Sequence, residues 1–197
     1  TPDAYDYFLR RGTVAETMKY FKGQNKYIND LIEHGTYDEF WQARNVLPHL
    51  NKVTPAVMVV GGWFDAEDLY GPLNTYNTIE KSSKNYNTIV MGPWSHGDWA
   101  RNSANQVIGN INFGDIISGF YQKNIEANFF RHFLKNNGKG ENRLPEAYVF
   151  DSGKKEWKTY ETWPPQNTEK QDFFLQESRL TKMAKKNFAF EEFISDP

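Results

Sequence analysis

Ala56-Val57-Met58-Val59-Val60, continued by Gly61-Gly62-Trp63-Phe64-Asp65, is the stretch that decides the fold of this 197-residue chain. Its first five residues form an uninterrupted apolar run, which is typical of a strand buried on both faces of a parallel sheet. Thr88-Ile89-Val90-Met91 has the same character. The residues between the two runs, about 67–82, have the apolar spacing of a helix. Strand, helix and strand in this order predict a βαβ unit and hence an α/β fold.

The chain on either side of this unit has other patterns. Residues 1 to about 50 are predicted to form short helices, the first beginning at Pro2 or Asp3, and Gly12, Gly23 and Gly35 separate the helices that follow. A polar segment over 96–115 predicts a loop, and the apolar spacing over 118–136 predicts a long amphipathic helix.

The period of the apolar residues becomes two beyond residue 144. Residues 147–150 and 157–160, joined by a segment rich in turn-forming residues, predict a β-hairpin. We therefore expect a helical region over 1–52, the C-terminal half of an α/β domain over 53–140 and the beginning of a β domain over 141–197. The chain is expected to be a fragment of a longer protein.

The composition excludes several classes of partner and site. A formal charge of −2 gives no electrostatic reason to expect nucleic acid or an anionic membrane as a partner. A chain without cysteine has neither a disulfide scaffold nor a thiolate metal site. No stretch of the sequence approaches the roughly 20 apolar residues that a membrane span needs. We expect neither nucleic acid nor a membrane as a partner.

Asp65 and His96 each follow one of the two predicted strands by a few residues. Open α/β sheets carry their chemistry at this edge, and α/β-hydrolases have a triad Asp before the triad His. Such an Asp orients the His and stabilises the imidazolium formed during proton transfer. Alternatively, Asp65 caps the next helix, with Glu67 and Asp68 in its first turn. His96 would then be a loop residue bonded to a carbonyl group, and spacing alone leaves both interpretations open.

The other histidines and the serines are weaker candidates for catalytic or metal-binding roles. His34, His49 and His132 are expected to have structural or solvated roles, and no pair of histidines has the spacing of a zinc site. The sequence contains no Gly-x-Ser-x-Gly, the motif around the nucleophile of α/β-hydrolases. Ser95 adjoins His96 directly, so neither its spacing nor its context suits a nucleophile. The sequence also lacks a phosphate-binding loop and a dinucleotide fingerprint.

Two motifs resemble a known family. Gly62-Trp63-Phe64-Asp65, followed by Val90-Met91-Gly92-Pro93-Trp94-Ser95-His96-Gly97, is similar to the cocaine esterase/glutaryl-acylase type of serine hydrolase in the X-Pro dipeptidyl-peptidase superfamily. The string Asp65-Ala66-Glu67-Asp68 most resembles the α-amino acid ester hydrolases, also described as glutaryl-7-aminocephalosporanic-acid acylases. The resemblance covers essentially the whole chain.

The resemblance implies a domain organisation. Residues 1–52 would belong to a helical cap, residues 53–140 to the C-terminal part of an α/β-hydrolase domain, and residues 141–197 to the beginning of a C-terminal β jelly roll. The nucleophilic serine and the oxyanion hole would lie upstream of this chain. The 197 residues by themselves are therefore expected to be inactive.

The resemblance also implies roles for individual residues. Asp65 matches the triad acid and His96 the triad base, while Glu67 and Asp68 match two carboxylates that bind the α-ammonium group of the substrate. A cationic amine suits these carboxylates, whereas an anionic glutaryl group would be repelled by them. The alternative role of Glu67 and Asp68, as residues of a helix start, remains open.

The implied activity is hydrolysis of esters or amides of α-amino acids through a Ser-Asp-His triad, on a small-molecule substrate and without cofactor or metal. An X-Pro dipeptidyl peptidase and an esterase for neutral acyl groups are alternatives within the superfamily. An alternative of another class is a non-catalytic module that binds carbohydrate or protein through its aromatic residues. The resemblance also makes a homo-oligomer and a periplasmic or secreted location plausible.

Overall fold

The computed structural model describes residues 3–101, 105–137, 139, 144–176, 179–184, 190 and 192–195. The chain divides into two compact units. The first unit combines Thr1–Asn45 with Glu169–Pro197, and the second is Val46–Thr168. The second unit carries the two strands predicted first from the sequence, so it also carries the candidate site.

Short helices dominate the described part of the first unit. They are α1 (Ala4–Arg11), α2 (Val14–Phe21), α3 (Lys26–Glu33) and α4 (Glu39–Gln42). Each begins after a residue whose side chain accepts a backbone N–H of the first turn, namely Asp3, Thr13, Asn25 and Asp38. Two further segments, β7 (Phe174–Gln176) and β8 (Arg179–Thr181), form an antiparallel pair. The short helices predicted for the N-terminal region are confirmed.

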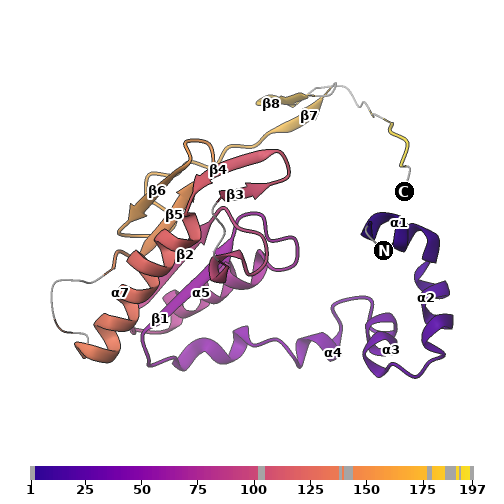
Figure 1. Ribbon diagram of the computed structural model, residues 1–197, viewed down its shortest axis with the longest axis horizontal. Helices are drawn as coiled ribbons and strands as arrows, with labels where there is room; N and C mark the ends of the chain where they lie inside the picture. The colour runs from indigo at the N-terminus through magenta and orange to yellow at the C-terminus, as the bar shows by residue number, and fades with distance from the viewer. Residues whose placement is uncertain are drawn as a thin grey trace. The chain divides into compact units, whose positions relative to one another are not determined.

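The second unit is built on a mixed sheet with the strand order β1-β2-β5-β6 (Figure 1). Its strands are β1 (Val57–Gly62), β2 (Asn87–Gly92), β5 (Ala147–Asp151) and β6 (Glu156–Tyr160). β1, β2 and β5 run parallel, and β6 returns antiparallel beside β5. The helix α5 (Tyr70–Ser82) connects β1 to β2, which confirms the predicted βαβ unit.

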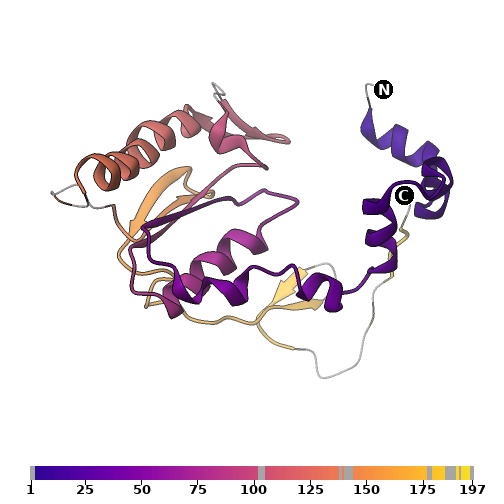
Figure 2. The same cartoon turned by 90° about the horizontal axis from the view of Figure 1, so that it is seen from below.

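Helices cover both faces of this sheet (Figure 2). On one face, Tyr76 and Ile79 of α5 pack with buried residues of the strands such as Ile89 and Met91. The other face is covered by a run of helical turns, α6 (Ile117–Phe120), η3 (Tyr121–Glu126), α7 (Ala127–Phe130) and η4 (Arg131–Lys135). All six residues of β2 are buried, because this central strand lies between the two helical layers.

The helical run confirms the long amphipathic helix predicted for this region, but two of its segments, η3 and η4, are π-helical. The core residues of the run recur at every fourth position: Ile117, Tyr121, Ile125 and Phe129. Phe120 and Leu134 lie off this row and are exposed.

The loop predicted after His96 is partly wrong. A short helical turn, η2 (Asp98–Ala100), is followed by the strands β3 (Asn105–Ile108) and β4 (Ile111–Asp115), which pair antiparallel. Ile108 pairs with Ile111, so Gly109 and Asn110 form a two-residue turn, and Gly109 has a φ of 55°. A Gly-Asn pair between β-branched residues is a hairpin signal, and it outweighs the polar character of the flanking sequence.

The structure also corrects the expected domain boundaries at residues 52 and 141. β5 pairs in parallel with β2, and Ala147, Val149 and Phe150 of β5 are buried between the two helical layers. β5 and β6 therefore complete the α/β sheet rather than begin a separate β domain, and the second unit extends to Thr168. Apolar residues recur with a period of two in an edge strand of an α/β sheet and in a strand of a separate β domain. The sequence pattern therefore could not distinguish these two architectures. The helical cap and the jelly roll remain predictions.

The domain boundary expected at residue 52 lies earlier, between Asn45 and Val46. The helical turn η1 (Leu47–Lys52) belongs to the second unit, where the Ser82 hydroxyl of α5 donates to the Leu50 carbonyl at 3.3 Å. None of the helices in the described ranges is both long and apolar enough to cross a membrane.

Candidate active site

The candidate site lies where β1 and β2 end. Gly62 and Gly92 are opposite each other in the last register position of this parallel pair. The pairing continues beyond them, because Trp63 N donates to Gly92 O at 2.9 Å and Phe64 N donates to Trp94 O at 3.1 Å. The two chain segments that leave the sheet are therefore held side by side as they approach Asp65 and His96.

Glycine permits this close approach. A Cβ added at Gly62 would lie 2.2 Å from the Trp94 carbonyl oxygen, and one added at Gly92 would lie 2.3 Å from the Trp94 ring. Trp94 is completely buried, and its Nε1 donates to the Ser118 hydroxyl at 3.0 Å. The glycines of both sequence motifs thus let one buried indole fix the spacing of the strand ends.

Asp65 and His96 meet at this edge of the sheet. Oδ2 of Asp65 lies 3.0 Å from Nδ1 of His96, and the Asp65 side chain is only 2% exposed. Oδ1 of the same carboxylate accepts the backbone N–H groups of Glu67 at 2.9 Å and Asp68 at 3.0 Å. Burial raises the pKa of the Asp65 carboxyl, but the two backbone donors and His96 outweigh burial and keep that pKa below its usual value. A buried, ionised carboxylate therefore faces Nδ1 of the imidazole.

His96 is open on its other side. Its side chain is 57% exposed, and Nε2 has no hydrogen-bond partner among the described residues. Bonding of Nδ1–H to a carboxylate leaves Nε2 as the basic nitrogen, which can accept a proton from a nucleophile within hydrogen-bond distance of it. The indole of Trp99 lies edge-on to the imidazole, with 6.3 Å between the ring centroids.

Glu67 and Asp68 occupy the turn between β1 and α5, and they differ in their contacts. Oε2 of Glu67 lies 3.8 Å from Nδ1 of His96, and the Glu67 side chain is 74% exposed. Oδ1 of Asp68 accepts the backbone N–H of Gly71 at 2.8 Å, at the beginning of α5. The helix begins at Tyr70, a few residues later than the sequence predicts. Both residues precede α5 instead of forming its first turn: Asp68 bonds to the beginning of the helix, whereas Glu67 lies beside the imidazole.

A second His–Asp pair lies in the first unit. Nδ1 of His34 is 2.7 Å from Oδ2 of Asp38, and the imidazole stacks on Phe40 with 4.1 Å between the ring centroids. The pair joins the end of α3 to the beginning of α4, and Trp41 Nε1 donates to the His34 carbonyl. His34 thus has the kind of structural contacts expected for it at a helix end. Of the other two histidines, His49 is exposed in η1 and His132 is buried in η4.

Two serines near the candidate site, Ser95 and Ser118, are engaged elsewhere. The Ser95 hydroxyl donates to Oδ2 of Asp98 at 2.6 Å. The Ser118 hydroxyl accepts from Trp94 and donates to the Asp98 carbonyl at 3.0 Å. Neither hydroxyl is bonded to His96, in agreement with the sequence argument against Ser95 as a nucleophile.

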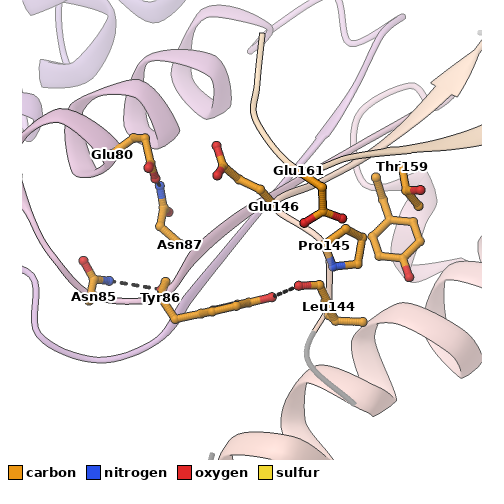
Figure 3. A pocket seen from close by; sticks show the side chains of 10 residues that line it. Glu80, Asn85, Tyr86, Asn87, Leu144, Pro145, Glu146, Thr159 and Glu161 are labelled. Atoms are coloured by element: carbon orange, nitrogen blue, oxygen red, sulfur yellow. Dashed lines mark hydrogen bonds between the residues drawn. The ribbon is translucent and has the colours of Figure 1, made fainter. Parts of the chain in front are cut away.

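A cavity of about 480 Å³ lies elsewhere in the second unit (Figure 3). Asn87, the first residue of β2, and Glu146, which directly precedes β5, both line this cavity. The cavity therefore lies at the end of the sheet where these strands begin, opposite to Asp65 and His96. Two of its carboxylates are bonded within the fold: Glu80 accepts from the Asn87 amide at 3.0 Å, and Glu146 accepts from the Tyr76 hydroxyl. In the described part of the chain, no cluster of three or more His, Cys, Asp or Glu side chains could hold a metal ion.

The sequence argument overlooked Asp98, whose carboxylate organises the turn that carries His96. Ser95 N and Ser95 Oγ both bond to its Oδ2, at 3.0 and 2.6 Å. A signal was present in the sequence, because Ser-x-x-Asp next to glycine is typical of a turn closed by side-chain bonds to the backbone.

Comparisons with known proteins found a matching family model and several similar proteins. Residues 3–98 match the family model of X-Pro dipeptidyl-peptidase (S15 family). Cocaine esterase from Rhodococcus sp. (strain MB1 Bresler) is 23% identical over 152 residues, which are 75% of this chain and 25% of the esterase. The chain thus spans about a quarter of the length of this relative.

Two solved structures are similar over most of the chain. An aminopeptidase from the marine sediment archaeon Thaumarchaeota archaeon has a TM-score of 0.71 at 26% identity, covering 88% of this chain and 32% of the aminopeptidase. An α-amino acid ester hydrolase labelled with selenomethionine has a TM-score of 0.72 at 26% identity, covering 82% of this chain and 27% of the hydrolase.

Proposed function

Because the chain belongs to the superfamily of X-Pro dipeptidyl peptidases and cocaine esterase-type hydrolases, we propose that Asp65 and His96 are the acid and the base of a Ser-Asp-His triad. The observation that carries this proposal is the 3.0 Å contact between Asp65 Oδ2 and His96 Nδ1 at the ends of adjacent parallel strands. The exposed imidazole and the buried carboxylate are what such a triad requires.

The proposed reaction is nucleophilic catalysis of ester or amide hydrolysis. A serine hydroxyl attacks the substrate carbonyl while Nε2 of His96 takes its proton, and His96 then gives that proton to the leaving group. Asp65 holds Nδ1–H and stabilises the imidazolium that forms between the two transfers. Water, activated by His96 in the same way, hydrolyses the acyl-enzyme and restores the serine.

The nucleophilic serine of this proposal lies outside the 197 residues, because they contain no Gly-x-Ser-x-Gly and Ser95 is bonded to Asp98. Tests of activity therefore use the complete open reading frame that contains these residues, called the complete protein below. The 197 residues alone are expected to be inactive towards phenylglycine methyl ester. Hydrolysis by the isolated chain that disappears in His96→Ala would overturn this part of the proposal.

For the substrate, we propose an ester or amide of an α-amino acid. Glu67 lies beside His96 and is largely exposed, so its carboxylate is available to an ammonium group bound next to the reacting carbonyl. Asp68 adds a second negative charge in the same turn. These charges favour a cationic acyl group and repel an anionic glutaryl group. The structural similarity to an α-amino acid ester hydrolase supports the same substrate class.

Two matched substrates test this assignment in the complete protein. Phenylglycine methyl ester carries an α-ammonium group, and phenylacetic acid methyl ester has the same ring without it. Glu67→Gln should raise KM for the first ester about fivefold, the effect of losing an ion pair of ~1 kcal/mol, and leave KM for the second unchanged. Equal changes with both esters would overturn the ammonium assignment and leave the triad standing.

Two other activities within the superfamily have specific support. The family model over residues 3–98 is that of X-Pro dipeptidyl-peptidase, and cocaine esterase is a curated relative. Release of p-nitroaniline from Ala-Pro-p-nitroanilide, at a kcat/KM above that for phenylglycine methyl ester, would favour the peptidase. A preference for phenylacetic acid methyl ester would favour an esterase for neutral acyl groups.

A further inference from the structure

Asp98 has an unusually full set of hydrogen bonds for a residue close to the candidate site. Its Oδ2 accepts Ser95 N at 3.0 Å, Ser95 Oγ at 2.6 Å and Gln106 Nε2 at 3.2 Å. Its Oδ1 accepts Arg101 Nη1 at 3.1 Å. The Asp98 side chain is 17% exposed. One carboxylate therefore joins both ends of the turn 95–98 to the first strand of the β3–β4 hairpin.

The backbone of Asp98 is also fixed from the core. Its carbonyl oxygen accepts the Ser118 hydroxyl at 3.0 Å, and that hydroxyl in turn accepts Trp94 Nε1 at 3.0 Å. Trp94 and Ser118 are almost completely buried, so they form a rigid support beneath the turn. Gly97, with a φ of 78°, supplies the left-handed conformation that closes the turn between His96 and Asp98.

His96 itself has few contacts that could orient its ring. Its side chain is more than half exposed, and the contacts described for the imidazole are those with Asp65, Glu67 and Trp99. Two of these partners lie on the segment after β1, so the distance from Nδ1 to Asp65 depends on where the turn 95–98 holds the His96 backbone. The position of the ring is therefore set largely by the anchors of that turn.

We propose that Asp98 is a positioning residue for His96, which holds the turn 95–98 so that Nδ1 stays within hydrogen-bond distance of Asp65. This inference rests on the proposed function, since it assigns Asp98 to the same triad. Asp98 acts through Ser95 and the backbone and touches neither substrate nor the reacting atoms. Side chains that orient metal-ligating residues in proteins typically change activity about 10–100-fold when they are removed, and we expect an effect of the same order for Asp98.

Asp98→Asn in the complete protein is the first test, with Asp172→Asn as the matched control. Asp172 is a carboxylate whose side chain is 70% exposed, so its amide variant should behave as the wild type. The carboxylate of Asp98 accepts three hydrogen bonds on Oδ2 and one on Oδ1. Asn has one amide oxygen with two lone pairs, and its NH₂ group, which only donates, would face a donor in place of the other oxygen. We expect kcat for phenylglycine methyl ester to fall about 10–100-fold with KM changed less than twofold. An unchanged kcat would overturn the proposal.

A spectroscopic measurement separates this proposal from that of the triad. The Nδ1 proton of His96, bonded to Asp65, is expected as a low-field resonance in the proton NMR spectrum of the folded protein, assigned by its absence in His96→Ala. Asp98→Asn should broaden or shift this resonance, and Asp172→Asn should leave it in place. A resonance unaffected by Asp98→Asn would overturn the positioning role. Full activity in His96→Ala would instead overturn the triad, whatever the NMR result.

If Asp98→Asn does not fold, Ser95→Ala tests the positioning role of Asp98 instead. Ser95→Ala removes one donor to Asp98 and keeps the Ser95 N–H bond, so the turn loses only part of its support. We expect a decrease in kcat of about 3–10-fold, again with little change in KM. Wild-type kcat together with an unshifted His96 resonance would contradict the proposal.

Discussion

Nδ1 of His96 lies 3.0 Å from Oδ2 of Asp65, while Oδ1 of the same carboxylate is bonded to two backbone N–H groups of the turn before α5. Asp65 is therefore both the cap of its own turn and the partner of His96. The two roles that the sequence offered for Asp65 do not exclude each other, because the carboxylate uses a different oxygen for each contact.

Asp65→Asn separates these two contacts. The amide oxygen can still accept the backbone N–H groups, but the NH₂ group cannot accept Nδ1–H of His96. The imidazole is then no longer held in the tautomer that has a basic Nε2. We expect kcat of the complete protein to fall by about 10³–10⁴-fold, with the circular dichroism spectrum unchanged.

Asp172→Asn is again the control, because it makes the same chemical change on an exposed side chain. A decrease in kcat of less than tenfold in Asp65→Asn would contradict the triad role of Asp65. It would leave the residue with its capping role alone.

The strands and their order around the candidate site could be predicted from the sequence. Two apolar runs separated by a helical pattern specify parallel neighbours, and parallel neighbours bring their C-terminal ends to the same edge. Once both runs were identified as strands, Asp65 and His96 were therefore expected at the same edge of the sheet, and the pairing of β1 with β2 brings them together. The roles assigned to them, to Glu67 and to Asp68 remain proposals.

The parts of the fold that could not be predicted depend on contacts between distant segments. Residues 147–150 have the pattern of a hairpin strand in either of two architectures, and only their pairing with β2 decides between them. The π-helical segments in the run after Ile117 are likewise specified by no local preference. The proposed positioning role of Asp98 depends in the same way on distant segments. Gln106 of the β3–β4 hairpin bonds to its carboxylate, and Ser118 of α6 bonds to its carbonyl oxygen.

Substitutions of Asp68 and of Glu67 should differ in their effect on the free energy of unfolding. Asp68→Ala removes the acceptor for Gly71 N at the beginning of α5 and should lower the free energy of unfolding by ~1 kcal/mol. Asp68→Asn keeps an acceptor for Gly71 N, so it should lower the free energy of unfolding by less than about 0.5 kcal/mol. Glu67→Gln, on a largely exposed side chain, should change it by less than about 0.5 kcal/mol. Urea denaturation measures all three values, and equal losses for Asn and Ala at residue 68 would contradict the capping role.

Gly62→Ala should be strongly destabilising. The added Cβ would lie 2.2 Å from the Trp94 carbonyl oxygen, a backbone atom that cannot move without disturbing the end of β2. We expect a loss of ~3 kcal/mol in the free energy of unfolding. Gly153→Ala, in the turn between β5 and β6, is the control, because its Cβ would meet Asp151 Oδ1 at an ordinary 3.4 Å. Similar stabilities for the two variants would contradict the close approach at Gly62.

The stabilising effect of Asp98 should depend on pH. Burial raises the pKa of its carboxyl, but the hydrogen bonds from Ser95 and Gln106 and the charge of Arg101 outweigh burial, so the pKa is lower than usual. A carboxyl with a lowered pKa in the folded state stabilises the protein above its ordinary pKa of about 3.9, and this stabilisation is lost as the pH falls through the folded-state value.

Asp98→Asn should therefore lower the free energy of unfolding by ~2 kcal/mol at pH 7, the effect of hydrogen bonds to a charged group. The difference between wild type and variant should become smaller as the pH is lowered below about 4. Urea denaturation at pH 7 and at pH 3 gives the two differences. A difference that grows at the lower pH would contradict the charged state of Asp98 in the fold.

The central claim is that Asp65 and His96 activate a serine of the complete protein. The most direct measurement is the rate at which a fluorophosphonate probe modifies the wild type, His96→Ala and Asp172→Asn, followed by identification of the labelled residue by mass spectrometry. We expect one labelled serine, within a Gly-x-Ser-x-Gly motif outside these 197 residues, and a labelling rate at least 10³-fold lower in His96→Ala only. Equal labelling rates in the wild type and His96→Ala, or labelling of Ser95, would contradict the account.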